Sequence, residues 1–86
     1  MTRLRLLSRP GCHLCDRLRA QADEMLEGIP HSWEIVDVDS LPDLAARFGD
    51  AIPILFVGDR LFAKTRLPPI ATRLRLRRAA RAQSGE

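Results

Sequence analysis

Two cysteines lie where the pattern of the chain changes from that of a strand to that of a helix. The segment is Ser8-Arg9-Pro10-Gly11-Cys12-His13-Leu14-Cys15-Asp16, and it contains both cysteines of the 86-residue chain. A Cys-x-x-Cys pair closes a small disulfide ring. A thiol at a helix N-terminus also ionises more readily, because unpaired backbone N–H groups and the positive end of the helix dipole face it. The segment therefore predicts a redox-active dithiol.

Two other interpretations of the cysteine pair stay open. In the first, the pair is half of a structural zinc site. The only histidines available to complete such a site are His13 and His31, and structural zinc sites normally need four well-spaced ligands. Alternatively, the pair is inert and packs in the core. In a cytoplasmic protein, however, a Cys-x-x-Cys pair is more often catalytic or metal-binding than structural. We therefore favour the redox interpretation.

The length and the apolar runs predict one small domain in the cytoplasm. No apolar run approaches the ~18 residues that a membrane helix needs. The apolar stretch at the N-terminus is too short for a secretory signal. We expect a single domain over residues 1–81, a frayed tail over residues 82–86 and no contact with a membrane.

The first half of the chain has the pattern of a strand, a helix and a second strand. Alternating Leu and Arg predict a strand over residues 3–8. A second strand is predicted over residues 33–38. Between them, apolar residues recur at helical spacing and predict the buried face of a helix: Leu14, Leu18, Ala22, Met25 and Leu26. A unit of this kind predicts two parallel strands joined by a right-handed crossover.

The second half begins with a short helix and a hairpin. Asp39 or Ser40 is expected to cap a helix over residues 41–48. Two strands, over residues 52–57 and 60–63, flank the turn sequence Gly-Asp, which predicts an antiparallel hairpin with the second strand at the sheet edge.

A pair of prolines, Pro68 and Pro69, is expected to open the last helix. Its predicted sheet-facing residues are Leu67, Ile70 and Leu74. The order β-α-β-α-β-β-α predicts an α/β fold in which helices flank a four-stranded mixed sheet.

Two motifs in this order give the chain a resemblance to a known family. Cys12-His13-Leu14-Cys15 lies between the first strand and the first helix, and Ile52-Pro53 opens the third strand. Over about residues 3–80 the chain resembles the small bacterial glutaredoxin-like proteins of the thioredoxin superfamily. The resemblance implies a thioredoxin-like fold and thiol–disulfide oxidoreductase activity in cell redox homeostasis.

The resemblance also implies roles for the residues between the cysteines. Cys12 is implied to be the attacking thiolate, and Cys15 the buried thiol that resolves the mixed disulfide with the substrate. A protonated His13 would stabilise the thiolate of Cys12.

Three further residues are implied to contact the substrate. The superfamily places a cis-proline beside its active-site cysteines, which implies a cis bond between Ile52 and Pro53. The backbone of Ile52 is then implied to pair with the substrate chain. Arg9 stands where many glutaredoxins carry a lysine that meets a glutathione carboxylate.

The segment Phe62-Ala63-Lys64-Thr65-Arg66 departs from the family pattern. Glutaredoxins that use glutathione carry a Gly-Gly pair here, followed by a polar or acidic residue. The bulkier Phe62 and Ala63 fill the space of the tripeptide, although Lys64 or Arg66 would still attract a carboxylate. We expect no tightly bound cofactor, with glutathione as one candidate reductant beside a reductase. By analogy with some glutaredoxins, an iron–sulfur cluster bridged between two chains is a further alternative.

The positive charge is concentrated near the C-terminus. After Thr72 there is a single acidic residue, Glu86, against five arginines: Arg73, Arg75, Arg77, Arg78 and Arg81. Without interleaved aromatic residues such a face is usually solvated, so we expect no nucleic-acid partner. The expected partner of this monomer is a disulfide-containing protein or a low-molecular-weight thiol. The alternative is a thioredoxin-like protein-binding module whose thiols need no redox turnover and whose last helix attracts an acidic partner.

Overall fold

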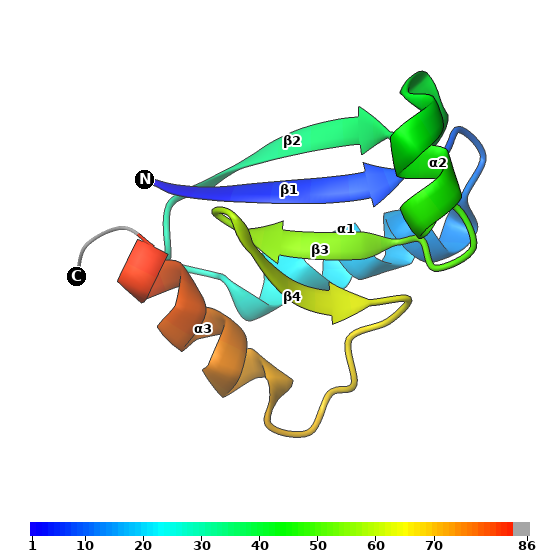
Figure 1. Cartoon of the computed structure of the whole chain (residues 1–86). Coiled ribbons are helices and arrows are strands. Elements are labelled where there is room, and N and C mark those ends of the chain that lie inside the picture. The colour runs from blue at the N-terminus through cyan, green and yellow to red at the C-terminus, as the bar shows by residue number, and fades with distance from the viewer. Residues whose placement is uncertain (84–86) are drawn as a thin grey trace.

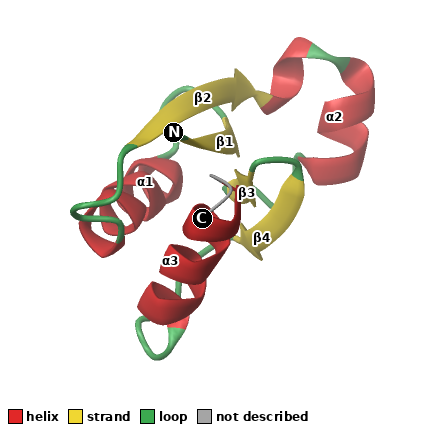
Figure 2. Ribbon diagram, turned by 90° about the vertical axis from the view of Figure 1, so that its left-hand side faces the viewer, coloured by secondary structure: helices red, strands yellow, loops and turns green. Residues whose placement is uncertain are grey.

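The computed structural model describes residues 1–83 as a four-stranded sheet with helices on both sides (Figures 1 and 2). The elements in chain order are β1 (Thr2–Ser8), α1 (His13–Met25), β2 (His31–Asp37), the 3-10 helix η1 (Val38–Ser40), α2 (Pro42–Phe48), β3 (Ile54–Val57), β4 (Arg60–Lys64) and α3 (Thr72–Gln83). This order confirms the predicted α/β fold. Figure 2 shows α1 and α3 on one side of the sheet and α2 on the other.

The sheet has the strand order β2-β1-β3-β4. β1 is parallel to β2, as expected for strands joined by a helical crossover, and antiparallel to β3. β3 and β4 form the predicted hairpin. Gly58 in its turn has φ 59°, and a Cβ added there would lie 2.8 Å from Cγ of Gln83, so the turn requires glycine.

The hydrophobic core lies between the sheet and the pair of helices α1 and α3. Its buried members include Leu4 and Leu6 of β1, and Leu76 and Ala80 of α3. Two polar contacts attach the C-terminal half of α3 to the start of β1. The hydroxyl of Thr2 donates to the carbonyl of Ala80 at 2.8 Å, and the backbone N–H of Arg3 donates to the side-chain oxygen of Gln83 at 2.8 Å.

The prediction for the last helix is wrong in its start and in its orientation. Pro68 and Pro69 lie in the preceding loop, and the helix begins at Thr72. Its buried residues are Thr72, Leu76 and Ala80, whereas Ile70 is 88% and Leu74 55% exposed. Leu74 and Leu76 are about 200° apart around a helix, so only one of them can face the sheet. Leu67 is buried as predicted, although it lies in the loop.

Two predictions for the other helices are also wrong. Leu14 is 52% exposed, because the buried stripe of α1 runs through Cys15, Leu18 and Ala22 instead. The N-cap residue of α2 is Leu41, which makes no side-chain capping hydrogen bond. The two polar residues expected to cap this helix, Asp39 and Ser40, belong to η1 instead.

The predicted frayed tail starts too early. Residues 82 and 83 continue α3, where the contact between Gln83 and Arg3 holds the helix end against β1. The rest of the predicted tail, residues 84–86, lies outside the described residues. None of the helices formed by residues 1–83 has both the length and the apolar character that a membrane crossing requires.

Candidate active site

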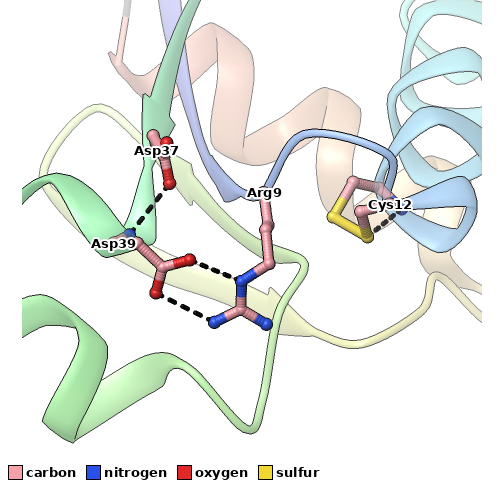
Figure 3. Close-up of polar contacts among 5 residues, drawn as sticks. Arg9, Cys12, Asp37 and Asp39 are labelled. Atoms are coloured by element: carbon pink, nitrogen blue, oxygen red, sulfur yellow. Dashed lines mark hydrogen bonds and ion pairs between the residues drawn. A yellow bond between two sulfur atoms is a disulfide. The ribbon is translucent and has the colours of Figure 1, made fainter.

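The two cysteines meet at the N-terminus of α1 (Figure 3). Cys12 is the N-cap residue and has an extended backbone, with φ −82° and ψ 102°, and Cys15 lies in the first turn. Their sulfur atoms form a disulfide, and their Cα atoms are 5.3 Å apart. The backbone N–H of Cys15 donates to the sulfur of Cys12 at 3.1 Å. The sulfur thus occupies the place that a serine or aspartate oxygen usually takes at a helix N-cap.

The turn before Cys12 explains this placement. The backbone N–H of Cys12 donates to the carbonyl of Arg9 at 3.1 Å, and Gly11 between them has φ 79°. Proline at the second position and a glycine with positive φ at the third are the signature of a type II turn. The sequence Arg9-Pro10-Gly11-Cys12 therefore turns the chain from the end of β1 directly into α1.

The two cysteines differ in their exposure to solvent. Cys15 is 2% exposed and belongs to the hydrophobic core, whereas Cys12 is only partly buried and packs at the edge of that core. Cys12 is therefore the more accessible of the two cysteines, while the protein covers Cys15.

The peptide bond between Ile52 and Pro53 is cis. Pro53 is buried, and Ile52 packs, like Cys12, at the edge of the core that contains Cys15. The carbonyl of Pro53 accepts a hydrogen bond from the backbone N–H of Thr65 at 2.6 Å. The hydroxyl of Thr65 donates to the carbonyl of Ala51 at 3.4 Å. The segment before β3 is thus attached to the residue that follows β4.

Arg9 forms a two-point ion pair with Asp39, at 2.6 Å from Nε and 3.0 Å from Nη2 (Figure 3). Asp37 holds Asp39 in place by accepting its backbone N–H at 2.9 Å. The hydrogen bond and the opposite charge raise the pKa of Arg9 and lower the pKa of Asp39. The residue implied to meet a glutathione carboxylate therefore already binds a carboxylate of its own chain.

The two histidines are not brought together. His13 is exposed as the first residue of α1, and His31 begins β2, where its ring nitrogens face Asp23 and the carbonyl of Ile29. Among residues 1–83, no group of three or more His, Cys, Asp or Glu side chains is placed to hold a metal ion.

A family model described as glutaredoxin-like domain (DUF836) matches residues 3–77, which include both cysteines and Pro53. The chain belongs to this glutaredoxin-like family. The match confirms the predicted family and the thioredoxin-like fold. A search of curated proteins gives no match.

In this glutaredoxin-like domain, the segment from Phe62 to Arg66, which departs from the family pattern, is partly packed into the protein. Phe62 and Ala63 pack against the core, and the guanidinium carbon of Arg75 lies 5.3 Å from the ring centre of Phe62. Lys64 and Arg66 are exposed. Phe62 is the extra residue of a β-bulge in β4, because Leu61 and Ala63 pair with consecutive residues of β3.

Two of the five arginines on the last helix of this glutaredoxin-like domain have structural contacts. Arg75 covers Phe62, and the guanidinium of Arg77 donates to the carbonyls of Met25 and Glu27 at 3.1 and 2.8 Å. The sequence did not predict the contacts of Arg77, because about 50 residues separate Arg77 from Met25 and Glu27. The other three arginines of α3, Arg73, Arg78 and Arg81, are exposed.

Proposed function

We propose that this glutaredoxin-like domain is a thiol–disulfide oxidoreductase in which Cys12 is the nucleophile and Cys15 the resolving thiol. The observation that supports this proposal is the difference in exposure between two cysteines that form a disulfide at a helix N-terminus. In the reduced protein, the N–H of Cys15 and the helix dipole would stabilise a thiolate on Cys12. Burial would keep Cys15 from competing substrates.

The proposed reaction exchanges one disulfide for another. The thiolate of Cys12 attacks one sulfur of the substrate disulfide, so that a mixed disulfide forms and the other substrate sulfur leaves as a thiolate, which takes up a proton. Cys15 then loses its proton and attacks the sulfur of Cys12. The bond to the substrate breaks, the second substrate thiol leaves, and the disulfide between Cys12 and Cys15 forms. Two electrons have passed from the protein to the substrate.

The remaining parts of the proposal concern the partners of this dithiol. The backbone of Ile52 beside Pro53 would pair with the substrate chain, and a protonated His13 would favour the thiolate. The dithiol would be regenerated in the cytoplasm by a reductase or by glutathione. The packing of Phe62 and Ala63, and the pairing of Arg9 with Asp39, count against a dependence on glutathione.

Two serine variants test this function. We expect the wild-type protein to show a reversible two-electron couple in redox buffers. Cys12→Ser should abolish the reduction of a model disulfide, because no nucleophile remains accessible. Cys15→Ser should instead accumulate a mixed disulfide that mass spectrometry detects, because Cys12 still attacks but nothing resolves the product.

The same experiment separates an oxidoreductase from a binding module with incidental thiols. A binding module would show no redox couple in the wild-type protein, or would keep its residual turnover after Cys12→Ser. Either result would contradict the proposed function.

A further inference from the structure

A groove of about 440 Å³ lies between α1 and the loop that joins β4 to α3. Leu14, Arg17 and Leu18 of α1 line one side, and Arg66, Leu67 and Pro69 of the loop line the other. The α1 residues have i, i+3 and i+4 spacing, so they share one helix face. Leu14 lies between the two cysteines in sequence, so one end of the groove is within two residues of Cys12 along the chain.

The charged residues that line this groove are both basic. Arg17 and Arg66 lie on its opposite sides, and no acidic residue among residues 1–83 lines it. Both arginines are exposed, and neither side chain has an ion pair or hydrogen bond within the described part of the chain. Arg9, by contrast, is neutralised by Asp39. A guanidinium binds carboxylates through two parallel N–H groups, so two unpaired ones across a groove favour an acidic ligand.

The other lining residues are mostly apolar, and apolar surface continues beyond the groove. Leu14 is 52% exposed, and Ile70, which directly follows Pro69, is 88% exposed. Pro68 and Pro69 offer no backbone N–H group, so these two residues make apolar contacts and donate no hydrogen bonds. Exposed apolar side chains next to a groove are typical of surfaces that bind a protein segment.

We propose that the groove binds an acidic segment of a protein substrate, adjacent to the substrate cysteine that Cys12 attacks. Carboxylates of the segment lie at Arg17 and Arg66, and an aliphatic side chain lies against Leu14 and Pro69. The volume is that of a small ligand site, which fits a few residues of an extended chain. This inference rests on the proposed function of the dithiol and names its substrate class, which is proteins with acidic and aliphatic residues beside the disulfide.

Three short peptides that differ only in charge test the groove. Each contains one internal disulfide and a flanking leucine, and the residues next to the cysteine are Glu in the first, Gln in the second and Lys in the third. The measured quantity is the second-order rate constant at which each peptide oxidises the pre-reduced protein. We expect the wild-type protein to react about fivefold faster with the Glu peptide than with the Gln peptide, and slowest with the Lys peptide.

The variants locate the origin of this preference. In the double variant Arg17→Gln/Arg66→Gln, the ratio between the Glu and Gln peptides should fall to about one, in line with the loss of both ion pairs. Arg78→Gln is the matched control, since Arg78 is exposed on α3 and does not line the groove. It should keep the wild-type ratio. A ratio near one in the wild-type protein, or an unchanged ratio in the double variant, overturns the proposal.

A second measurement separates failure of the groove from failure of the redox function. If the reduced protein reacts with none of the peptides, the proposed function is wrong. The groove is then tested with a Glu peptide in which serine replaces both cysteines, by following backbone amide NMR shifts. Shifts at residues 14–21 and 65–67 that disappear in the double variant support the groove. Their absence in the wild-type protein overturns it.

Discussion

At the scale of single residues, the contacts of His31 favour its protonated form. Its Nδ1 lies 2.7 Å from the carbonyl of Ile29, and its Nε2 lies 2.7 Å from the carboxylate of Asp23. Both partners accept hydrogen bonds, so this arrangement favours the imidazolium, in which both ring nitrogens donate. Partial burial acts to lower the pKa of His31, but the two hydrogen bonds and the negative charge of Asp23 together outweigh it, so the pKa is raised above 6.5.

Asp23 is the shared acceptor of this cluster. Burial acts to raise its pKa. The hydrogen bonds from His31 and from the indole N–H of Trp33, at 2.8 Å, together with the positive charges of His31 and Arg19, outweigh that effect and lower the pKa below 3.8. The pair of Asp23 and His31 stabilises the fold most between pH 3.8 and pH 6.5, which are the ordinary pKa values of an aspartate and a histidine. The contribution of His31 is complete below about pH 6.5 and is lost as the pH rises through its raised pKa. The contribution of Asp23 is present above about pH 3.8 and is lost as the pH falls through its lowered pKa.

We predict that His31→Gln lowers the free energy of unfolding by about 0.5–1 kcal/mol more at pH 5.5 than at pH 8.5. The reason is that the wild-type protein loses the charge of His31 at the higher pH while the variant has none to lose. Urea unfolding at both pH values measures the difference.

An NMR titration of the His31 ring in Asp23→Asn serves as the control for this pH effect. The pKa of His31 should be lower in that variant than in the wild-type protein, because the carboxylate that favours the imidazolium is gone. The same pKa in both proteins would contradict the proposed pairing.

At the residue scale, local sequence predicted the cysteine pair but not the partners of its neighbours. The spacing of Cys12 and Cys15 and the turn before them lie within a few residues of each other, so their arrangement follows from local rules. The ion pair between Arg9 and Asp39 joins residues 30 apart in sequence. No local pattern indicates such a pair, because it forms only when η1 is folded against the end of β1.

At the scale of elements, the C-terminus of α1 depends on a residue from another helix. The last turn of α1 contains no basic residue, and its carbonyls carry the negative end of the helix dipole. Arg77 of α3 donates to the carbonyls of Met25 and Glu27. One side chain thus caps α1 and joins it to α3.

We predict that Arg77→Ala lowers the free energy of unfolding by about 1–2 kcal/mol, because the carbonyls lose a charged donor while their own position is unchanged. Arg78→Ala, at the next and exposed position of the same helix, should change the free energy by less than about 0.5 kcal/mol. Urea unfolding followed by circular dichroism compares the two variants. Equal losses would show that Arg77 contributes no more than a surface residue.

The sequence predicted which elements form but not the orientation of every helix. Strands and helices follow from local periodicity, and all the predicted ones are present. In α3, however, leucines occur on both sides, at Leu74 and Leu76, so periodicity alone does not tell which side is buried. Contacts with Thr2 and Arg3 of β1, about 80 residues away, select the side of Leu76.

At the scale of the whole molecule, the buried thiol and the hydrophobic core are continuous. Cys15 packs in the same cluster as Leu4, Leu18, Leu67 and Leu76, which come from β1, α1, the loop and α3. The disulfide itself joins residues only three positions apart, so it closes a very short loop. In the chain-entropy model such a loop stabilises a fold by about 2 kcal/mol, which is the low end of the usual range. The core, rather than the disulfide, should therefore determine whether the chain folds.

We predict that reduction with dithiothreitol leaves the protein folded and lowers its free energy of unfolding by about 2 kcal/mol.

Leu76→Ala should lower the free energy of unfolding by about 3 kcal/mol or more, because Leu76 is 0% exposed and its removal leaves a cavity between the sheet and α3. The matched control, Leu74→Ala, removes a side chain that is 55% exposed and should cost less than about 1 kcal/mol. Urea unfolding of the oxidised and the reduced wild-type protein, and of both variants, measures these differences. A protein that unfolds on reduction would have a structural disulfide and could not complete a catalytic cycle, whereas one that stays folded in both states can exchange its disulfide repeatedly.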